Sequence, residues 1–416
     1  MTEEIKQRIE TIKAGKVPDG YKRTVVGIVP NEWENKRLSE LLKFQNGVNA
    51  DKEKYNSGIK MISVMDILSN SPIFYDNIRG HVDIDEKTLN NYSVTYGDIL
   101  FQRSSETVED AGKSNVYMDE ENIATYSGFV IRGKKVSDYN PFYLNELLKS
   151  SKVRQQIIKY SAGSQHINVS QDSLSKVNVC FTNKHEQNRI AEILLKWDKV
   201  IELQEKLIEK LELQKKALMQ KLLKPKKEWK PVPLKKILKE RKTYSTKGQE
   251  YIHVTLSKQG ICDKTDQYER DFLVTSENKG YKITKLNDLC YNPANLKFGV
   301  ICLNKYGSAI FSPIYVTFEI SEIYNCDFIG AVLASEAFIN KIRRFEEGSL
   351  YERQAVKPND FIKDTILIPD RSVQDDIAKA ILKIDKQIRL HNEKLNLLKY
   401  QQKAMQQLLL TGIVRV

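Results

Sequence analysis

The sequence predicts a mixed α/β (α+β) protein built as a tandem repeat, in which an α/β domain and a long helix are followed by a second domain and a second helix. Two observations predict this plan. One helical stretch occurs twice, 187 residues apart, and each copy follows short β-branched and aromatic runs that are typical of strands. In addition, a chain of 416 residues is too long for one compact core.

The two helical stretches are close copies of one another. Residues 187–223 align with residues 374–410 without a gap, and 16 of the 37 positions are identical. Apolar residues in each copy recur at alternating steps of four and three, which predicts the seam of a coiled coil. We expect the helices to bury these seams on each other as an antiparallel, pseudo-twofold pair. The predicted seam residues are Ile190, Leu194, Trp197, Ile201, Ile208, Leu211, Leu218 and Leu222 in the first copy, and Ile377, Ile381, Ile384, Ile388, Leu395, Leu398, Met405 and Leu409 in the second.

Polar residues interrupt both seams at the same two places. Gln204 in the first copy corresponds to His391 in the second, and Lys215 corresponds to Gln402. Such interruptions fix the register of a coiled coil at some expense of stability. We therefore expect His391 to bond to its opposite number in the seam rather than to bind a ligand.

Repeated segments also relate the two domains. The segment "WENKRLSELL" from Trp33 matches "WKPVPLKKIL" from Trp229, and "YSVTYGDILF" matches "YKITKLNDLCY". Pro225 cannot continue the first helix, so it begins the link to the second domain. The expected division is an N-terminal segment with the first domain (1–183), the first helix (184–226), the second domain (227–370) and the second helix (371–416).

The first 30 residues have no counterpart in the second half of the chain. Thr2 can cap a short amphipathic helix that extends through Ile12. The segment "TVVGIVP" offers a strand that can pair with the C-terminal "TGIVRV". Such a pairing would bring the two chain ends together.

Composition indicates a cytoplasmic protein with neither a metal nor a cofactor of its own. The five cysteines are scattered and never form Cys-x-x-Cys, which argues for a reducing compartment and against structural zinc. The N-terminus lacks the apolar core of a secretion signal, and no apolar run approaches the length of a membrane span. We expect no membrane partner.

The chain is basic, with a net charge of +12. Residues 184–228 and 371–416, which contain the two helices, hold nine of these excess positive charges. A polyanionic partner is one explanation, and a lysine-rich solvated surface is the other.

Resemblances to catalytic motifs are incomplete. "DAGKS" lacks the first glycine of a phosphate-binding loop, and "YNPAN" lacks the aromatic residue of adenine methyltransferases. Asp19 and Glu34, with Lys36, satisfy a loose metal-nuclease pattern, which stays open as an alternative. The five histidines have no metal-ligand spacing. We expect a chain without a reaction centre of its own.

The whole plan resembles the specificity subunit of type I restriction-modification systems. The resemblance covers residues 30–416 and rests on the Trp-Leu segments that open each domain and on the helix starts "NKHEQNRIAEIL" and "RSVQDDIAKAIL". It implies that each domain is a target-recognition domain that reads half of a split double-stranded DNA site, while the helices act as a ruler. It also implies docking of two methyltransferase subunits, which bind S-adenosylmethionine, and of motor-nuclease restriction subunits.

The two domains differ in sequence, so an asymmetric bipartite target is expected. A coiled-coil scaffold without a nucleic-acid role is a further alternative.

Base readout requires polar side chains on loops that enter the major groove. The candidate loop residues are Gln102, Arg103, Ser104, Ser164, Gln165 and His166 in the first domain, and Asn292, Asn295, Lys297, Tyr351, Arg353 and Gln354 in the second.

Overall fold

The structure, a computed structural model, divides the chain into two compact units. Unit 1 comprises Met1–Leu203 and Leu395–Val416, and unit 2 comprises Gln204–Lys394. Each unit contains one α/β domain and a part of both long helices. The residues described are 2–163, 166–245, 251–258, 260–263, 280–346 and 354–416.

Unit 1 is built on a four-stranded antiparallel sheet in the order β4-β11-β7-β9. A three-stranded sheet, β10-β5-β6, contains the parallel pair β10·β5. Helices α5 and α6 pack on the first sheet in one hydrophobic core that includes Phe101 and Tyr143. The strands of the two sheets are β4 (Leu42–Asn46), β11 (Val130–Lys135), β7 (Ile99–Gln102), β9 (Ser114–Val116), β10 (Thr125–Tyr126), β5 (Tyr55–Ile62) and β6 (Gly80–Val82). The other elements are α1 (Glu3–Lys13), β1 (Tyr21–Thr24), β2 (Gly27–Pro30), β3 (Glu34–Arg37), α2 (Leu38–Leu41), η1 (Lys52–Lys54), α3 (Val64–Ile67), η2 (Tyr75–Asn77), α4 (Glu86–Asn91), β8 (Ser104–Ser105), α5 (Pro141–Lys149), α6 (Ser151–Tyr160), β12 (Ile167–Asn168), α7 (Gln171–Ser175) and β13 (Asn178–Phe181).

Unit 2 repeats this architecture, as the matching segments predict. Its four-stranded antiparallel sheet has the order β15-β23-β20-β21, and a second sheet, β16-β19-β22-β17-β18, contains the parallel pair β17·β22. The strands are β15 (Leu238–Glu240), β23 (Val316–Ile320), β20 (Leu289–Tyr291), β21 (Ile301–Leu303), β16 (Tyr244–Ser245), β19 (Tyr281–Thr284), β22 (Ala309–Phe311), β17 (Ile252–Ser257) and β18 (Gly260–Asp263). The other elements are β14 (Lys230–Pro233), α9 (Leu234–Ile237), η4 (Leu296–Phe298), α10 (Cys326–Leu333), α11 (Glu336–Ile342), η5 (Arg343–Phe345), α12 (Pro358–Phe361) and β24 (Thr365–Ile368).

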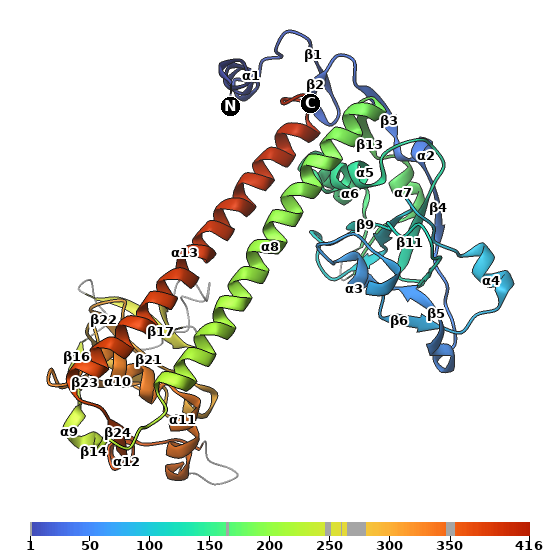
Figure 1. The fold of residues 1–416 in the computed structure, drawn as a ribbon. Helices are drawn as coiled ribbons and strands as arrows, with labels where there is room; N and C mark the ends of the chain where they lie inside the picture. Colours follow the sequence, from blue (N-terminus) through green and yellow to red (C-terminus); the bar gives the residue numbers. More distant parts are fainter. Residues whose placement is uncertain (1, 164–165, 246–250, 259, 264–279, 347–353) are drawn as a thin grey trace. The chain divides into compact units, whose positions relative to one another are not determined.

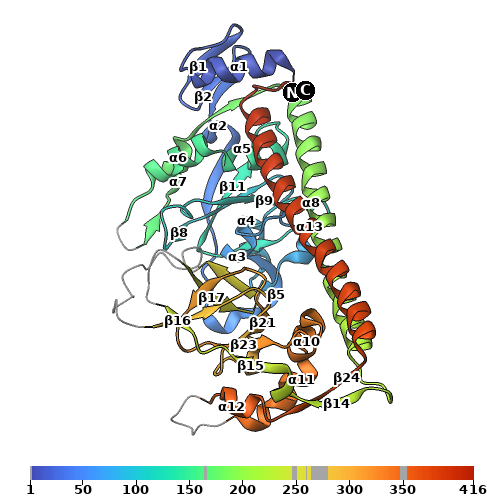
Figure 2. The same cartoon turned by 90° about the vertical axis from the view of Figure 1, so that its left-hand side faces the viewer.

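The two long helices are α8 (Lys184–Leu222) and α13 (Arg371–Leu410). They lie side by side and run in opposite directions (Figures 1 and 2). The prediction of two long antiparallel helices and mixed α/β domains is thus confirmed. All sixteen predicted seam side chains are buried or half-buried. Gly412, at a φ of +68°, follows α13, and its N–H donates to the Leu409 carbonyl.

The expected strand pairing between the chain ends is wrong. The segment "TVVGIVP" contributes to a hairpin, β1·β2, and residues 411–416 form no strand. The N-terminal and C-terminal segments of the chain are nevertheless in contact within unit 1. The Tyr21 hydroxyl donates to the Gly412 carbonyl at 2.7 Å, and the Arg8 guanidinium donates to the Ile413 carbonyl at 2.5 Å. The short turn at Val25–Val26 favours the local hairpin over pairing with the distant C-terminus.

Candidate nucleic-acid interface

In unit 1, the structure brings the two predicted loops together. Ser104 lies on β8 and His166 immediately precedes β12, and these two short strands pair in antiparallel register. The Ser104 hydroxyl donates to Asn168 Oδ1 at 2.5 Å. Ser164 and Gln165 lie outside the described residues. Loops about 60 residues apart in sequence therefore form one surface.

The predicted residues of this surface differ in accessibility. Gln102 is buried, with 6% of its surface exposed, and its amide donates to the Ser104 carbonyl at 2.9 Å. Arg103 is half-buried; its Nη1 donates to the Gly128 carbonyl at 3.2 Å. His166 is exposed. Gln102 thus shapes the loop, whereas Arg103 and His166 are accessible to a ligand.

Arg103 lines a polar notch with a cavity volume of about 460 Å³. Asn46, Asn168 and Gln171 line the same notch, and sequence reasoning missed all three. Their amides can both donate and accept hydrogen bonds, as base edges require. The available signal was weak, because each is simply a polar residue at a strand end or at the start of a short helix.

In unit 2, the predicted loops also meet. The N–H of Val356 donates to the Pro293 carbonyl at 3.2 Å, and the Tyr291 hydroxyl donates to the Val356 carbonyl at 3.0 Å. Asn292 is buried, and its side-chain oxygen accepts the N–H of Ala294 at 3.1 Å. Asn292 therefore stabilises the turn that precedes η4.

The remaining candidates of unit 2 lie around this contact. Asn295 and Lys297 are half-buried, and the Lys297 ammonium lies 5.5 Å from the centre of the Phe298 ring. Gln354 is exposed. Tyr351 and Arg353 lie outside the described residues.

The two loop pairs occupy equivalent places in the two units. In each unit, one loop follows the third strand in the order of the four-stranded sheet, which is β7 in unit 1 and β20 in unit 2. The other loop follows helix α6 in unit 1 and helix α11 in unit 2. The residues presented at these places differ between the units. The duplicated fold therefore carries two dissimilar polar surfaces.

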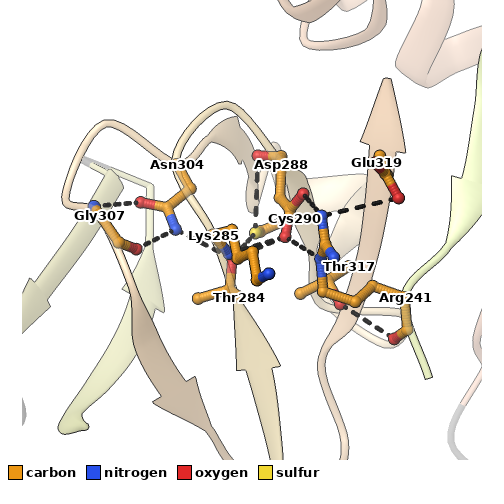
Figure 3. A network of polar contacts seen from close by, with 9 residues as sticks. All are labelled: Arg241, Thr284, Lys285, Asp288, Cys290, Asn304, Gly307, Thr317 and Glu319. Carbon is orange, nitrogen blue, oxygen red and sulfur yellow. Dashed lines mark hydrogen bonds and ion pairs between the residues drawn. The ribbon is translucent and has the colours of Figure 1, made fainter. Parts of the chain in front are cut away.

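A buried polar network lies in unit 2 at the end of the β20·β21 pair that is opposite the Asn292–Lys297 loop (Figure 3). Arg241 makes two hydrogen bonds to the Asp288 carboxylate, at 2.7 and 2.8 Å, and the Asp288 side chain is only 2% exposed. Asn304 donates to Thr284 Oγ1 at 2.9 Å and to the Gly307 carbonyl at 2.7 Å. This network ties together the strand ends that precede β20 and follow β21.

The equivalent carboxylate in unit 1 is Asp98, which is 1% exposed. It accepts the N–H groups of Lys135, at 2.9 Å, and Thr95, at 3.1 Å. Burial raises the pKa of Asp98, and these two hydrogen bonds offset only part of that effect. In unit 2 the N–H of Lys285 likewise donates to Asp288, at 2.7 Å, so the two units differ in the other donor, which is the Lys135 backbone in unit 1 and the Arg241 guanidinium in unit 2.

The polar residues that interrupt the predicted coiled-coil seams make contacts between the two long helices. In unit 2, the Gln204 side chain bonds to Nδ1 of its counterpart, His391, at 2.9 Å, and Lys215 forms an ion pair with Asp385 at 2.6 Å. In unit 1, the positions equivalent to Lys215 and Asp385 are Gln402 and Asp198, which lie 2.5 Å apart. The expectation for His391 is confirmed, and the same pair of positions is in contact in both units.

A buried glutamine connects each domain to the start of its helix. Gln187 Oε1 accepts the N–H of Asn140 at 2.9 Å, and Gln187 Nε2 donates to the Thr182 carbonyl at 2.7 Å. Gln374 makes the same two bonds in unit 2, to the N–H of Asn325 and the carbonyl of Pro369. We call this contact the glutamine bridge.

The residues of the nuclease alternative are not clustered for metal binding. Glu34 lies on β3 with 71% of its side chain exposed, and it pairs with Lys36 at 3.2 Å. Among the residues that the structure describes, no group of three or more His, Cys, Asp or Glu could hold a metal ion. No described helix has both the length and the apolar character of a membrane span.

Comparisons with known proteins agree with this architecture. The family model described as "Type I restriction modification DNA specificity domain" matches residues 30–213. A Methanocaldococcus jannaschii protein provisionally assigned as the type I restriction enzyme MjaX specificity subunit is 23% identical over 96% of this chain and 97% of its own length. The MjaVIII specificity subunit of the same organism is 24% identical over 49% of this chain and 48% of its own length.

Solved structures show the same fold. The S subunit of a type I restriction-modification system from M. genitalium has a TM-score of 0.51 and 12% identity, with 91% of this chain and 96% of that chain covered. A chain from a structural study of type I R-M complex assembly and conformational transition has a TM-score of 0.59 and 12% identity, with 93% and 99% covered. Residues 30–213 thus match the DNA specificity domain of type I restriction modification, and nearly the whole chain has the fold of a type I restriction-modification S subunit.

Proposed function

We propose that the chain reads an asymmetric bipartite DNA sequence for a type I methyltransferase complex, with one half-site assigned to each unit. The observation that carries this proposal is the placement of dissimilar polar loop pairs at equivalent positions of a duplicated fold. A duplicated module suits a duplex whose two half-sites are presented by opposite strands. Different side chains at the two surfaces favour two different half-sites.

The helix pair is proposed as the spacer between the half-sites. α8 has 39 residues and α13 has 40. At 1.5 Å per residue, each helix extends about 60 Å, which is comparable with roughly two turns of DNA. The polar contacts at Gln204–His391 and Lys215–Asp385 fix the register and therefore support a defined length.

Partner subunits would supply the chemistry. The repeated glutamine bridge presents the same arrangement of domain and helix in each unit. Such repetition supports two methyltransferase subunits, which would carry S-adenosylmethionine, with motor-nuclease subunits joining for cleavage. The chain itself would be non-catalytic and would act on cytoplasmic DNA.

Reconstitution with the methyltransferase of the same system tests the proposal. Sequencing of the methylated adenines should give one bipartite sequence, and the methyltransferase alone, as control, should give none. Methylation without sequence preference, or no complex between the two proteins, would contradict the proposal.

Two arginine substitutions test the assignment of a half-site to unit 1. Arg103→Ala should relax readout within one half-site by about 1–3 kcal/mol per base pair and leave the other half-site unchanged. Arg103→Lys, a matched control, keeps the charge and removes the planar fork, so it should retain overall affinity but not full discrimination. An equal loss on every sequence would show that Arg103 contacts only phosphates.

Removal of equivalent heptads from both helices tests the spacer. Because the repeat aligns α8 and α13 without a gap, the same seven positions can be deleted from each helix while their pairing is kept. The distance between half-sites should shorten while both half-site sequences persist. Altered half-site sequences with an unchanged distance between them would contradict the proposal that the helix pair sets this distance.

A further inference from the structure

Unit 2 contains an extended groove between its domain helices and the helix pair. Two cavities, of about 670 and 660 Å³, adjoin each other and share Lys215, Met219 and Ala334 in their linings. The apolar lining includes Leu223, which directly follows α8, and Ile381 of α13. The groove therefore lies within one unit and is lined by α8, α10, α11 and α13.

Small residues on α10 keep this groove open. Gly330 and Ala331, within α10, and Ala334, which directly follows it, all line the groove. Gly330 faces Leu303 so closely that an added Cβ would lie 2.4 Å from Leu303 Cγ. No long side chain of α10 at positions 330, 331 and 334 reaches across to the long helices.

The equivalent helix of unit 1, α5, carries larger residues at these positions. Asn140 and Asn325 cap α5 and α10 in the same way, which aligns Ala331 with Glu146 and Ala334 with Lys149. Glu146 accepts hydrogen bonds from Gln406 at 2.7 Å and from Lys149 at 2.6 Å. In unit 1, a polar bridge thus spans the space that is open in unit 2.

The rim of the unit 2 groove is basic. Lys215 and Lys305 are neutralised by Asp385, at 2.6 Å, and Asp327, at 2.7 Å. Four further basic residues line the groove against only two further acidic residues, Glu212 and Glu336. The further basic residues are Lys216, Lys224, Lys386 and Arg389.

An apolar floor with a basic rim fits an amphipathic helix whose polar face carries carboxylates. A phosphate backbone fits less well, because it would meet four carboxylates and the apolar floor. We propose that the unit 2 groove binds an acidic amphipathic helix of one methyltransferase subunit. The two methyltransferase subunits would therefore bind with unequal affinity. This inference rests on the proposed function.

The test is a titration of the full chain with the purified methyltransferase subunit, followed by calorimetry and native mass spectrometry. The wild type should show two binding steps whose dissociation constants differ by at least tenfold. Ala331→Glu/Ala334→Lys gives unit 2 the residues of unit 1, and it should weaken only the tighter step, by tenfold or more. Circular dichroism checks that this variant folds.

Charge reversal at the rim gives a second test that does not fill the groove. Lys386→Glu/Arg389→Glu should weaken the tighter step, and this effect should shrink at high salt. Lys383→Glu is the matched control, because Lys383 is exposed on α13 and does not line the groove.

Two equal binding steps in the wild type, or unchanged steps in both groove variants, would overturn this inference while leaving the proposed function intact. Absence of any complex would instead overturn the proposed function. Sedimentation of the chain alone distinguishes a second copy as the occupant, because a dimer that the groove variants dissociate would refute the methyltransferase assignment.

Discussion

Replacement of Gln374 by methionine should selectively destabilise unit 2. Methionine keeps the length of the side chain and removes both bonds of the glutamine bridge, which leaves the N–H of Asn325 and the carbonyl of Pro369 without their present partner. Each unsatisfied buried group costs roughly 1–3 kcal/mol. Because Asn325 is half-buried and can recover some hydration, we expect a total loss of about 2–4 kcal/mol.

Urea unfolding measures the loss, and hydrogen exchange locates it. Exchange should accelerate in α10 (Cys326–Leu333) while α5 (Pro141–Lys149) is unaffected; Gln187→Met should give the reverse pattern. Gln401→Met, at an exposed position of α13, is the control and should change stability by less than about 0.5 kcal/mol. Equal unfolding midpoints for Gln374→Met and Gln401→Met would refute the role of the bridge.

Two further predictions concern the chain ends. Burial acts to raise the pKa of Glu186, but the hydrogen bonds from Arg415 and Thr182 outweigh burial, and the pKa is lowered. The Glu186 carboxylate therefore stabilises unit 1 at pH values above its pKa in the unfolded chain. This stabilisation is lost as the pH falls through the lowered pKa of the folded state. Arg415→Ala should therefore cost about 1–3 kcal/mol in urea unfolding at pH 7 and less at pH 3; a cost independent of pH would argue against the ion pair. Gly412→Ala should lower the melting temperature more than Gly15→Ala, since both glycines have positive φ but only at Gly412 would a Cβ approach Pro30, at 2.6 Å; equal shifts would remove the packing argument.

Because of the internal repeat, the order of the domains and long helices could be predicted from the sequence. A period of 3.5 residues and a gap-free match define both long helices and their seams, and Gln204 opposite His391 follows directly from the same alignment. The matching Trp-Leu segments likewise indicated that the second domain repeats the first.

The sequence did not allow us to predict which side chains of the loops face the solvent. Gln102 and Asn292 have the right chemistry for base contacts, yet the structure buries both, because successive strand residues face opposite sides and the sequence does not show which side is covered. Asn168 was missed because its position beside Ser104 depends on the pairing of two strands that are two residues long. The contact of Arg415 with Glu186 joins residues 229 apart and has no local pattern.

The division of the chain also has a consequence for synthesis. Unit 1 closes its core with Leu409 and Leu410, which lie at the very end of the chain. At roughly 5–20 residues per second, a ribosome needs about 10–40 s to make the roughly 190 residues of unit 2 that come first. During that time the seam of the first helix in unit 1 has no partner from its own chain. The rate of translation and the binding of chaperones to the exposed seam during this interval are therefore expected to limit the yield of the native protein.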